Sequence, residues 1–213
     1  SWSNGLAVYE RKAVIVPDQA NRKKLLEVIG HETTHLLFEG YWREVKKTPP
    51  AWMDEGLAMM EEAGSAEHPE QSDWYQAMAA LPPETIIPME KFMATNPAQD
   101  LHNKEMVSTW YVQAYSLVFF LYRGHSRLQF KNFCAHLRDG KEMREALWLV
   151  YRFATIDKFE KAWRSWLAKP EHTKRANLAQ RAARPAEEAT FKPRRKSNAQ
   201  GITPMRGFKS LRD

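Results

Sequence analysis

Two histidines with a glutamate beside the first form the part of the sequence best suited to chemistry, in His31-Glu32-Thr33-Thr34-His35. On an α-helix, four residues rise about 6 Å and complete little more than one turn, so both imidazoles lie on one face. They can then bind a single zinc ion at the usual zinc–nitrogen distance of about 2.0–2.1 Å. Glu32 would lie beside that ion, where its carboxylate can accept a proton from metal-bound water that attacks a carbonyl carbon.

The same pattern also occurs where two histidines are simply hydrogen-bonded at the margin of a core. The neighbouring residues favour metal binding, because they predict one amphipathic helix over residues 20–39 with the motif inside it. We expect Asp18 to cap the start of this helix and Gly40 to end it. Its expected apolar side consists of Leu25, Leu26, Val28, Ile29, Leu36, Leu37 and Phe38.

A catalytic zinc ion needs three protein ligands and one open position, so a third ligand is expected nearby. The next predicted helix, residues 51–63, follows Pro49-Pro50 and carries the neighbouring acids Asp54 and Glu55. Geometry alone does not separate these two acids as ligands. Either could instead be a solvated charge on a short helix.

At this point the sequence resembles the gluzincin metallopeptidases, and within them the bacterial peptidase MA-like domains. Trp52, Glu55, Gly56 and Ala58 match the Trp-x-x-Glu-Gly-x-Ala pattern of that family, and 19 residues separate His35 from Glu55. The resemblance covers roughly residues 5–168. It implies that His31, His35 and Glu55 bind one Zn²⁺ per chain and that Glu32 is the general base.

Zincins often carry a carboxylate four residues after the glutamate ligand, where it orients a ligand histidine. Here that position is Met59, and we expect Glu61 and Glu62 to lie on a solvated helix face. The sequence therefore identifies no partner for the outer nitrogen of either histidine.

A donor to the developing oxyanion is also expected, because hydrolysis passes through a tetrahedral intermediate. The stretch 110–121 resembles the tyrosine-bearing helix of aminopeptidase-type relatives. The resemblance implies Tyr111, three residues before Ala114, as the donor, with Tyr115 in reserve. Either tyrosine could equally be an ordinary buried aromatic residue.

Periodicity predicts a mainly α-helical fold with a small β-hairpin, an α+β arrangement that resembles the zincin-like helical catalytic domain. The hairpin is expected to pair residues 6–9 with 13–16 through a turn at 10–12. Pro82-Pro83 and Asn96-Pro97 are expected breaks. Besides the two helices above, helices are predicted over 70–80, 88–94, 105–123, 126–138, 141–152 and 156–168, the last capped by Thr155.

Strand 13–16 precedes the metal-binding helix, so we expect it to hold a peptide by strand addition. Aminopeptidase-type relatives carry a Gly-x-Met-Glu-Asn motif on this strand, whose glutamate binds the free amino terminus. The stretch near 5–9 lacks that motif, and Glu10 is the acid closest to it. A dedicated aminopeptidase is therefore disfavoured relative to an endopeptidase.

The chain of 213 residues, 43% of them hydrophobic, is long enough to bury a substantial core and has no apolar run that could cross a bilayer. Its net charge of +6 is uneven. Residues 169–213 contain twelve Lys or Arg against four Asp or Glu, whereas residues 1–168 contain twenty against twenty-two. We therefore predict a catalytic domain over 1–168 and a basic, disordered tail over 169–213 that could contact polyanions weakly.

These features predict a zinc metallopeptidase that acts on peptide or protein substrates. Two alternatives remain: a non-catalytic module that keeps the zinc-binding helices as a scaffold and binds polyanions through its basic tail, and a zinc hydrolase of non-peptide amides such as cell-wall crosslinks. The resemblance implies a periplasmic or secreted location, with any export signal upstream of Ser1. Cys134 is the single cysteine and is expected to be a small buried apolar residue.

Overall fold

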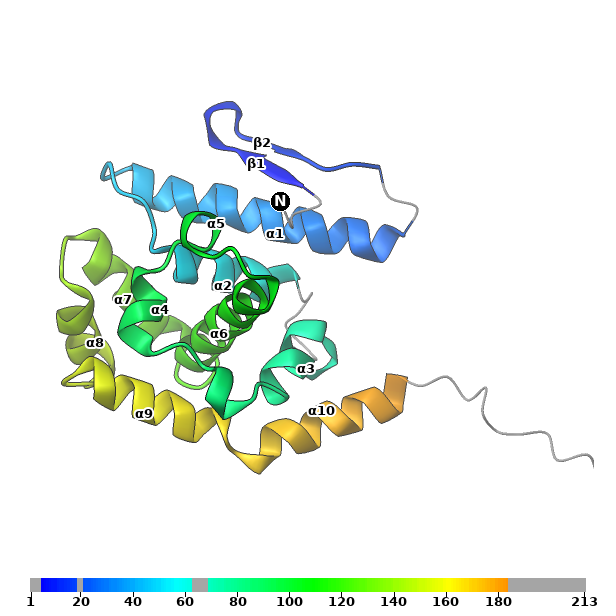
Figure 1. The fold of residues 1–213 in the computed structure, drawn as a ribbon. Coiled ribbons are helices and arrows are strands. Elements are labelled where there is room, and N and C mark those ends of the chain that lie inside the picture. Colours follow the sequence, from blue (N-terminus) through cyan, green and yellow to red (C-terminus); the bar gives the residue numbers. More distant parts are fainter. Residues whose placement is uncertain (1–4, 19–20, 63–68, 184–213) are drawn as a thin grey trace, which may run out of the picture. The chain divides into compact units, whose positions relative to one another are not determined.

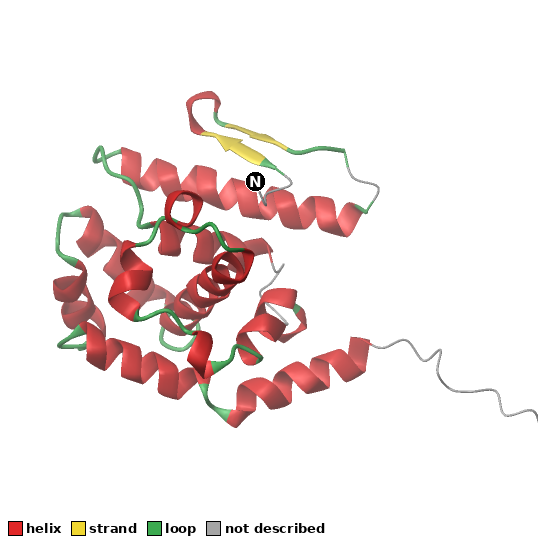
Figure 2. Ribbon diagram, viewed as in Figure 1, coloured by secondary structure: helices red, strands yellow, loops and turns green. Residues whose placement is uncertain are grey.

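Helices dominate the structure, a computed structural model that describes residues 5–18, 21–62 and 69–183 (Figures 1 and 2). The longer helices are α1 (Arg22–Arg43), α2 (Ala51–Glu62), α6 (Lys104–Tyr122), α7 (Arg127–Arg138), α8 (Met143–Tyr151), α9 (Ile156–Leu167) and α10 (Pro170–Ala183). The shorter ones are α3 (Asp73–Ala79), α4 (Met89–Ala94), α5 (Pro97–Asp100) and the 3-10 turns η1 (Tyr9–Arg11), η2 (Pro69–Gln71) and η3 (Pro83–Thr85). The mainly helical prediction is confirmed.

One antiparallel pair of strands, β1 (Leu6–Val8) and β2 (Ala13–Ile15), forms the predicted hairpin. Leu6 pairs with Ile15 and Val8 with Ala13. The chain reverses through η1 and Lys12, which adopts a left-handed conformation with φ of 49°. Both strands contact α1, beside which the hairpin lies in Figure 1. The predicted hairpin is therefore present, although each strand is one residue shorter than expected.

Helix α1 differs at both ends from its prediction. Asn21, not Asp18, is the N-cap, because its side-chain oxygen accepts hydrogen bonds from the backbone N–H groups of Lys23 and Lys24. Gly40 does not end the helix, which continues to Arg43. A Cβ at Gly40 would lie 3.1 Å from the Tyr9 ring, so this glycine lets η1 approach the helix closely.

Helix α2 packs against both α1 and α6, and a glycine lies in each of these contacts. A Cβ built on Gly30 of α1 would be 3.4 Å from the backbone oxygen of Glu61. One on Gly56 of α2 would lie only 2.5 Å from the backbone oxygen of Ala114 on α6. The glycine of the Trp-x-x-Glu-Gly-x-Ala pattern therefore sets how closely α2 approaches α6.

A core rich in aromatic residues fixes the other helices around α6. Trp52, Trp110 and Trp163, from α2, α6 and α9, are almost fully buried. Thr155 caps α9 by accepting a hydrogen bond from the N–H of Lys158, as predicted. Cys134 is buried as expected, and burial raises the pKa of its thiol to about 12, so the thiolate is strongly disfavoured.

The chain does not become irregular at residue 169. Helix α10 occupies Pro170–Ala183 and buries one face, which carries His172, Ala176 and Ala179. Nδ1 of His172 lies 2.9 Å from the hydroxyl of Tyr75 on α3. The compact unit therefore extends to Ala183, and the rest of the predicted tail, residues 184–213, lies outside the described residues. None of the helices that the structure describes is long and apolar enough to cross a membrane.

Candidate metal centre and catalytic site

His31 and His35 lie one turn apart on α1, and their Nε2 atoms are 3.1 Å from each other. Glu55, on the first half of α2, points its Oε2 atom at both rings, 3.9 Å from His31 Nε2 and 3.8 Å from His35 Nε2. Among the described residues, these three form the one group of potential ligands close enough to hold a metal ion. The structure therefore brings together the three residues that the sequence predicts as ligands.

A carboxylate engages the outer nitrogen of each histidine. His35 Nδ1 is 2.9 Å from Asp54 Oδ2, and His31 Nδ1 is 3.1 Å from Glu62 Oε2. Asp54, the alternative third ligand, thus contacts the outer nitrogen of His35 instead. The expectation that Glu62 faces solvent is wrong, whereas Glu61 is exposed.

The sequence did hold a signal for Glu62, the partner of His31. Asp54 and Glu62 flank Glu55 on the same helix, and Glu62 follows it by seven residues, or about two helical turns. Residues at that spacing share a face, so a carboxylate there can point to the same neighbouring helix as Glu55.

The donor set fits a metal ion. Ionised carboxylates only accept hydrogen bonds, so each Nδ1 atom donates to its carboxylate, and the two Nε2 atoms, 3.1 Å apart, need a proton or a cation between them. A zinc ion suits this spacing, because two ligand atoms of one tetrahedral zinc ion are about 3.3 Å apart. Two imidazoles and a carboxylate are also ligands that zinc prefers.

The electrostatics of the site favour positive charge. Burial alone would lower the pKa of His35, but the hydrogen bond and charge of Asp54, with the charges of Glu55 and Glu32, raise it to about 9. Burial raises the pKa of Glu55, and the nearby Asp54 and Glu32 add to this, whereas His35 and His31 lower it. A proton on His35 or a bound cation would each relieve this crowding of carboxylates.

Glu32 is buried, at 4% exposure, and lines the same cavity as the three potential ligands. It packs against the segment before β1: a Cβ built on Gly5 would lie 2.7 Å from Glu32 Cγ and 3.1 Å from its Oε1. The absence of a side chain at Gly5 therefore leaves the room in which the Glu32 carboxylate sits.

The two candidate tyrosines on α6 occupy different surroundings. Tyr111 lines the cavity, and burial together with the charge of Glu55 raises its pKa to about 12. Tyr115 is fully buried, does not line the cavity, and packs against Trp74 and Phe119. Burial raises its pKa as well. The geometry thus leaves Tyr111 as the tyrosine able to meet a substrate.

The cavity has a volume of about 670 Å³ and is lined by α1, α2, α6 and Trp74 of α3. Gly5, Leu6 and Ala7 also line it, whereas no residue of β2 does. The strand beside the metal-binding residues is therefore β1, not the predicted 13–16. Glu10 lies 3.1 Å from an Arg43 guanidinium nitrogen and does not line the cavity.

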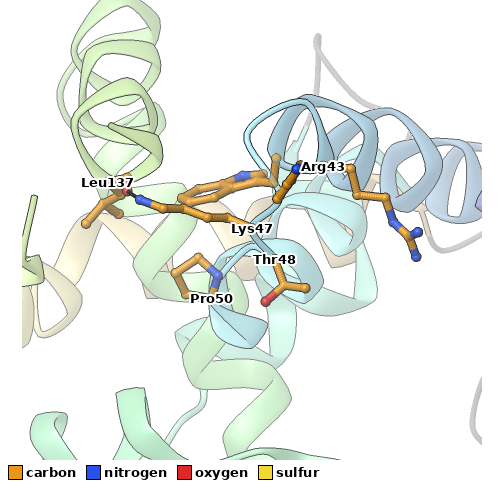
Figure 3. A pocket seen from close by; sticks show the side chains of 7 residues that line it. Arg43, Lys47, Thr48, Pro50 and Leu137 are labelled. Atoms are coloured by element: carbon orange, nitrogen blue, oxygen red, sulfur yellow. Dashed lines mark hydrogen bonds between the residues drawn. The ribbon is translucent and has the colours of Figure 1, made fainter. Parts of the chain in front are cut away.

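A second depression of about 710 Å³ lies between the end of α1, the following loop and α7 (Figure 3). Lys47 extends towards Leu137 and donates hydrogen bonds to the backbone oxygens of Leu137 and Arg138. Arg43 points away from the depression and forms ion pairs with Glu39 and Glu10. Lys47 and Arg43 are thus engaged with protein partners, and none of the predicted site residues lies here.

Comparison with known proteins finds a match at the level of a protein family. No curated protein and no solved structure matches the chain. The family model of the Peptidase MA superfamily, which is typically zinc-dependent, matches residues 1–169. Because that match covers most of the 213 residues, the chain belongs to the Peptidase MA superfamily, a membership that supports a peptidase-type enzyme.

Proposed function

We propose that the protein is a zinc-dependent metallopeptidase of the gluzincin type that cleaves peptide bonds within peptide or protein substrates. The convergence of His31 Nε2, His35 Nε2 and Glu55 Oε2, in a cavity that Glu32 also lines, is the observation that carries the proposal. Carboxylates behind both histidines strengthen it, because such partners are characteristic of zinc-bound imidazoles.

The residues around the ligands have separate roles in this reaction. Zinc held by His31, His35 and Glu55 would polarise the substrate carbonyl and lower the pKa of water. Glu32 accepts the proton of the attacking water and later returns it to the leaving amine. Tyr111 stays protonated near neutral pH, because its pKa is about 12, and donates a hydrogen bond to the developing oxyanion.

A polypeptide substrate fits the surroundings of the site. In the described part of the chain, β1 has a neighbouring strand, β2, on one of its two edges only. Leu6 and Ala7 of β1 line the cavity. An extended peptide can add to the other edge of β1 through backbone hydrogen bonds. Glu10, the acid nearest the strand in sequence, pairs with Arg43 and does not line the cavity, so it is not placed to bind a free amino terminus, which supports an endopeptidase.

Two substitutions test the proposal. Glu32→Gln should reduce the rate of hydrolysis of an unstructured protein substrate by about 10²-fold or more. The variant should still retain one zinc per chain. His35→Ala should lose stoichiometric zinc and activity together. Metal analysis of the purified variants, with a peptide-library digest in the presence and absence of phenanthroline, measures both. Zinc retained by His35→Ala, or undiminished hydrolysis by Glu32→Gln, would contradict the assignment.

The same experiment separates the two alternative functions. Zinc binding without peptide hydrolysis, but with Glu32-dependent cleavage of a cell-wall amide, would identify a hydrolase of non-peptide amides. Salt-sensitive polyanion binding that requires residues 169–213 and is unchanged in Glu32→Gln, without any hydrolysis, would identify a non-catalytic module.

A further inference from the structure

Glu62 holds two hydrogen-bond donors on a single carboxylate oxygen. Its Oε2 atom lies 3.1 Å from His31 Nδ1 and 3.1 Å from Nε1 of the Trp74 indole. Glu62 is the last residue of α2, whereas Trp74 belongs to α3. The outer side of the metal centre is therefore connected to a helix that supplies none of the zinc ligands.

The chemistry of the three groups fixes the direction of both hydrogen bonds. An indole nitrogen can only donate, and an ionised carboxylate can only accept. Glu62 therefore accepts a hydrogen bond from the Trp74 N–H. It also accepts one from His31 Nδ1, and so selects the His31 tautomer that is protonated on Nδ1. That tautomer leaves the Nε2 lone pair available to a metal. Without Trp74, the end of α2 would provide fewer constraints on where the Glu62 carboxylate lies.

The position of the Trp74 ring is fixed by packing against Tyr115. Its ring stacks on Tyr115, with 6.5 Å between ring centroids and 29° between their planes. Tyr115 is fully buried on α6, so it cannot move without disturbing the core. Trp74 also lines the cavity beside His31 and Glu55. Its indole N–H is thus aimed at Glu62 by packing as well as by the hydrogen bond.

The carboxylate that contacts His35 is positioned in a different way from Glu62. Asp54, which contacts His35 Nδ1, directly precedes Glu55 on α2. The position of Asp54 therefore follows from that of a zinc ligand on the same helical turn. Glu62 lies two turns further along α2, so its position follows less directly from that of Glu55. On the His31 side, the hydrogen bond from Trp74 supplies an anchor from another helix.

We propose that Trp74 is a positioning residue of the metal centre, which acts on zinc affinity through Glu62 and His31 in the Trp74–Glu62–His31 network and is backed by Tyr115. This inference rests on the proposed zinc ligands. It assigns Tyr115 a part in supporting the site from the core in place of the expected oxyanion contact.

Zinc affinity, measured by competition with a chelator, tests the network without reference to hydrolysis. Glu62→Ala should weaken zinc binding roughly 10–100-fold, as removal of such carboxylates usually does. Trp74→Phe keeps an aromatic ring for Tyr115 but loses the N–H, and should weaken binding roughly 3–10-fold. In the Glu62→Ala background, Trp74→Phe should have no further effect, because its partner is already absent.

A matched control separates positioning from general stability. Trp110→Phe also removes an indole hydrogen bond, from Nε1 to the backbone oxygen of Phe92, at a residue that does not line the cavity. It should lower the thermal unfolding midpoint while leaving zinc affinity unchanged. Glu62→Gln, which keeps an acceptor oxygen but no charge, should lie between wild type and Glu62→Ala and serves if Trp74→Phe folds poorly.

The outcomes distinguish this inference from the proposed function. A wild-type chain without zinc affinity would overturn both. Tight zinc binding by wild type, with unchanged affinity in Trp74→Phe, would overturn the role of Trp74 alone. Equal losses from Trp74→Phe in the wild-type and Glu62→Ala backgrounds would show that Trp74 acts by another route, and would also overturn it.

Discussion

Gly5 limits the position of the proposed general base. A methyl group at residue 5 would lie 2.7 Å from Glu32 Cγ and 2.9 Å from Val28 Cγ1, too close for either to stay in place. Gly5→Ala should therefore displace the Glu32 carboxylate and reduce kcat by about 10–100-fold, while zinc content stays at one per chain. Steady-state kinetics and metal analysis of the same preparation measure the two effects.

Gly40→Ala provides the control for this change. Its added methyl would approach the Tyr9 ring at 3.1 Å, at the same boundary between α1 and the hairpin segment but away from Glu32. We expect its kcat to stay close to that of wild type. A wild-type kcat in Gly5→Ala would show that Glu32 does not need its present position.

Single residues of the site were predictable to the extent that helical spacing determines them. The His31–Glu32–His35 pattern fixes which side chains share a face, because four residues make about one turn. The roles of Asp54 and Glu62 depend instead on how α2 lies against α1, a contact across 31 residues of sequence in the case of Glu62. Trp74 was not predicted either, since its hydrogen bond requires the placement of a third helix.

At the scale of helices, Gly56 sets the separation of α2 from α6. A methyl group there would meet both the Ala114 backbone oxygen and Val118 Cγ2 at 2.5 Å. Gly56→Ala should force the helices apart and destabilise the fold by about 1–3 kcal/mol, as overpacking of a core does. Because α2 carries Glu55 and α6 carries Tyr111, activity should fall as well. Denaturant unfolding followed by circular dichroism measures the free energy of unfolding.

Gly30→Ala is the matched comparison for the helix crossing. Its methyl would lie 3.4 Å from the Glu61 backbone oxygen, which is an ordinary van der Waals contact. Alanine also favours helix over glycine by about 1 kcal/mol, so Gly30→Ala should be neutral or slightly stabilising. If Gly56→Ala unfolded at the same denaturant concentration as Gly30→Ala, close packing of α2 on α6 would not be limiting.

Helix boundaries were predictable where a cap or an apolar repeat marks them. Helix α9 begins after Thr155, as predicted. The predicted end of α1 at Gly40 is wrong. A glycine can remain within a helix where it allows a neighbouring residue to approach closely, and at Gly40 that neighbour is Tyr9. Helix α10 was missed because alanines and a histidine form its buried face, so the apolar repeat that marks an amphipathic helix is weak.

For the whole compact unit, His172 links the last helix to the body of the protein. It is buried at 7% exposure, and its Nδ1 lies 2.9 Å from the Tyr75 hydroxyl. Burial lowers the pKa of His172 below its ordinary value of 6.5, assisted by the charges of Arg175 and Lys169, although the Trp166 backbone and Glu171 act in the opposite direction. The neutral imidazole is therefore the form compatible with the docked helix.

This shift determines how stability depends on pH. Because the unfolded chain binds a proton at His172 more readily than the folded chain, the folded state loses stability as pH falls through about 6.5. Above that pH, His172 is neutral in both states and the contribution is fully present. In the variant His172→Gln, this part of the pH dependence is absent, while that of His125, whose pKa burial also lowers, remains.

We therefore expect the free energy of unfolding of wild type to decrease more steeply than that of His172→Gln between about pH 7.5 and about pH 5.5. Chemical denaturation at several pH values, in zinc-saturated protein, gives the difference between the two slopes. Taking this difference removes the contributions that both proteins share, including those of the metal centre. Parallel curves would mean that protonation of His172 does not oppose folding, and that α10 docks on α3 independently of its charge.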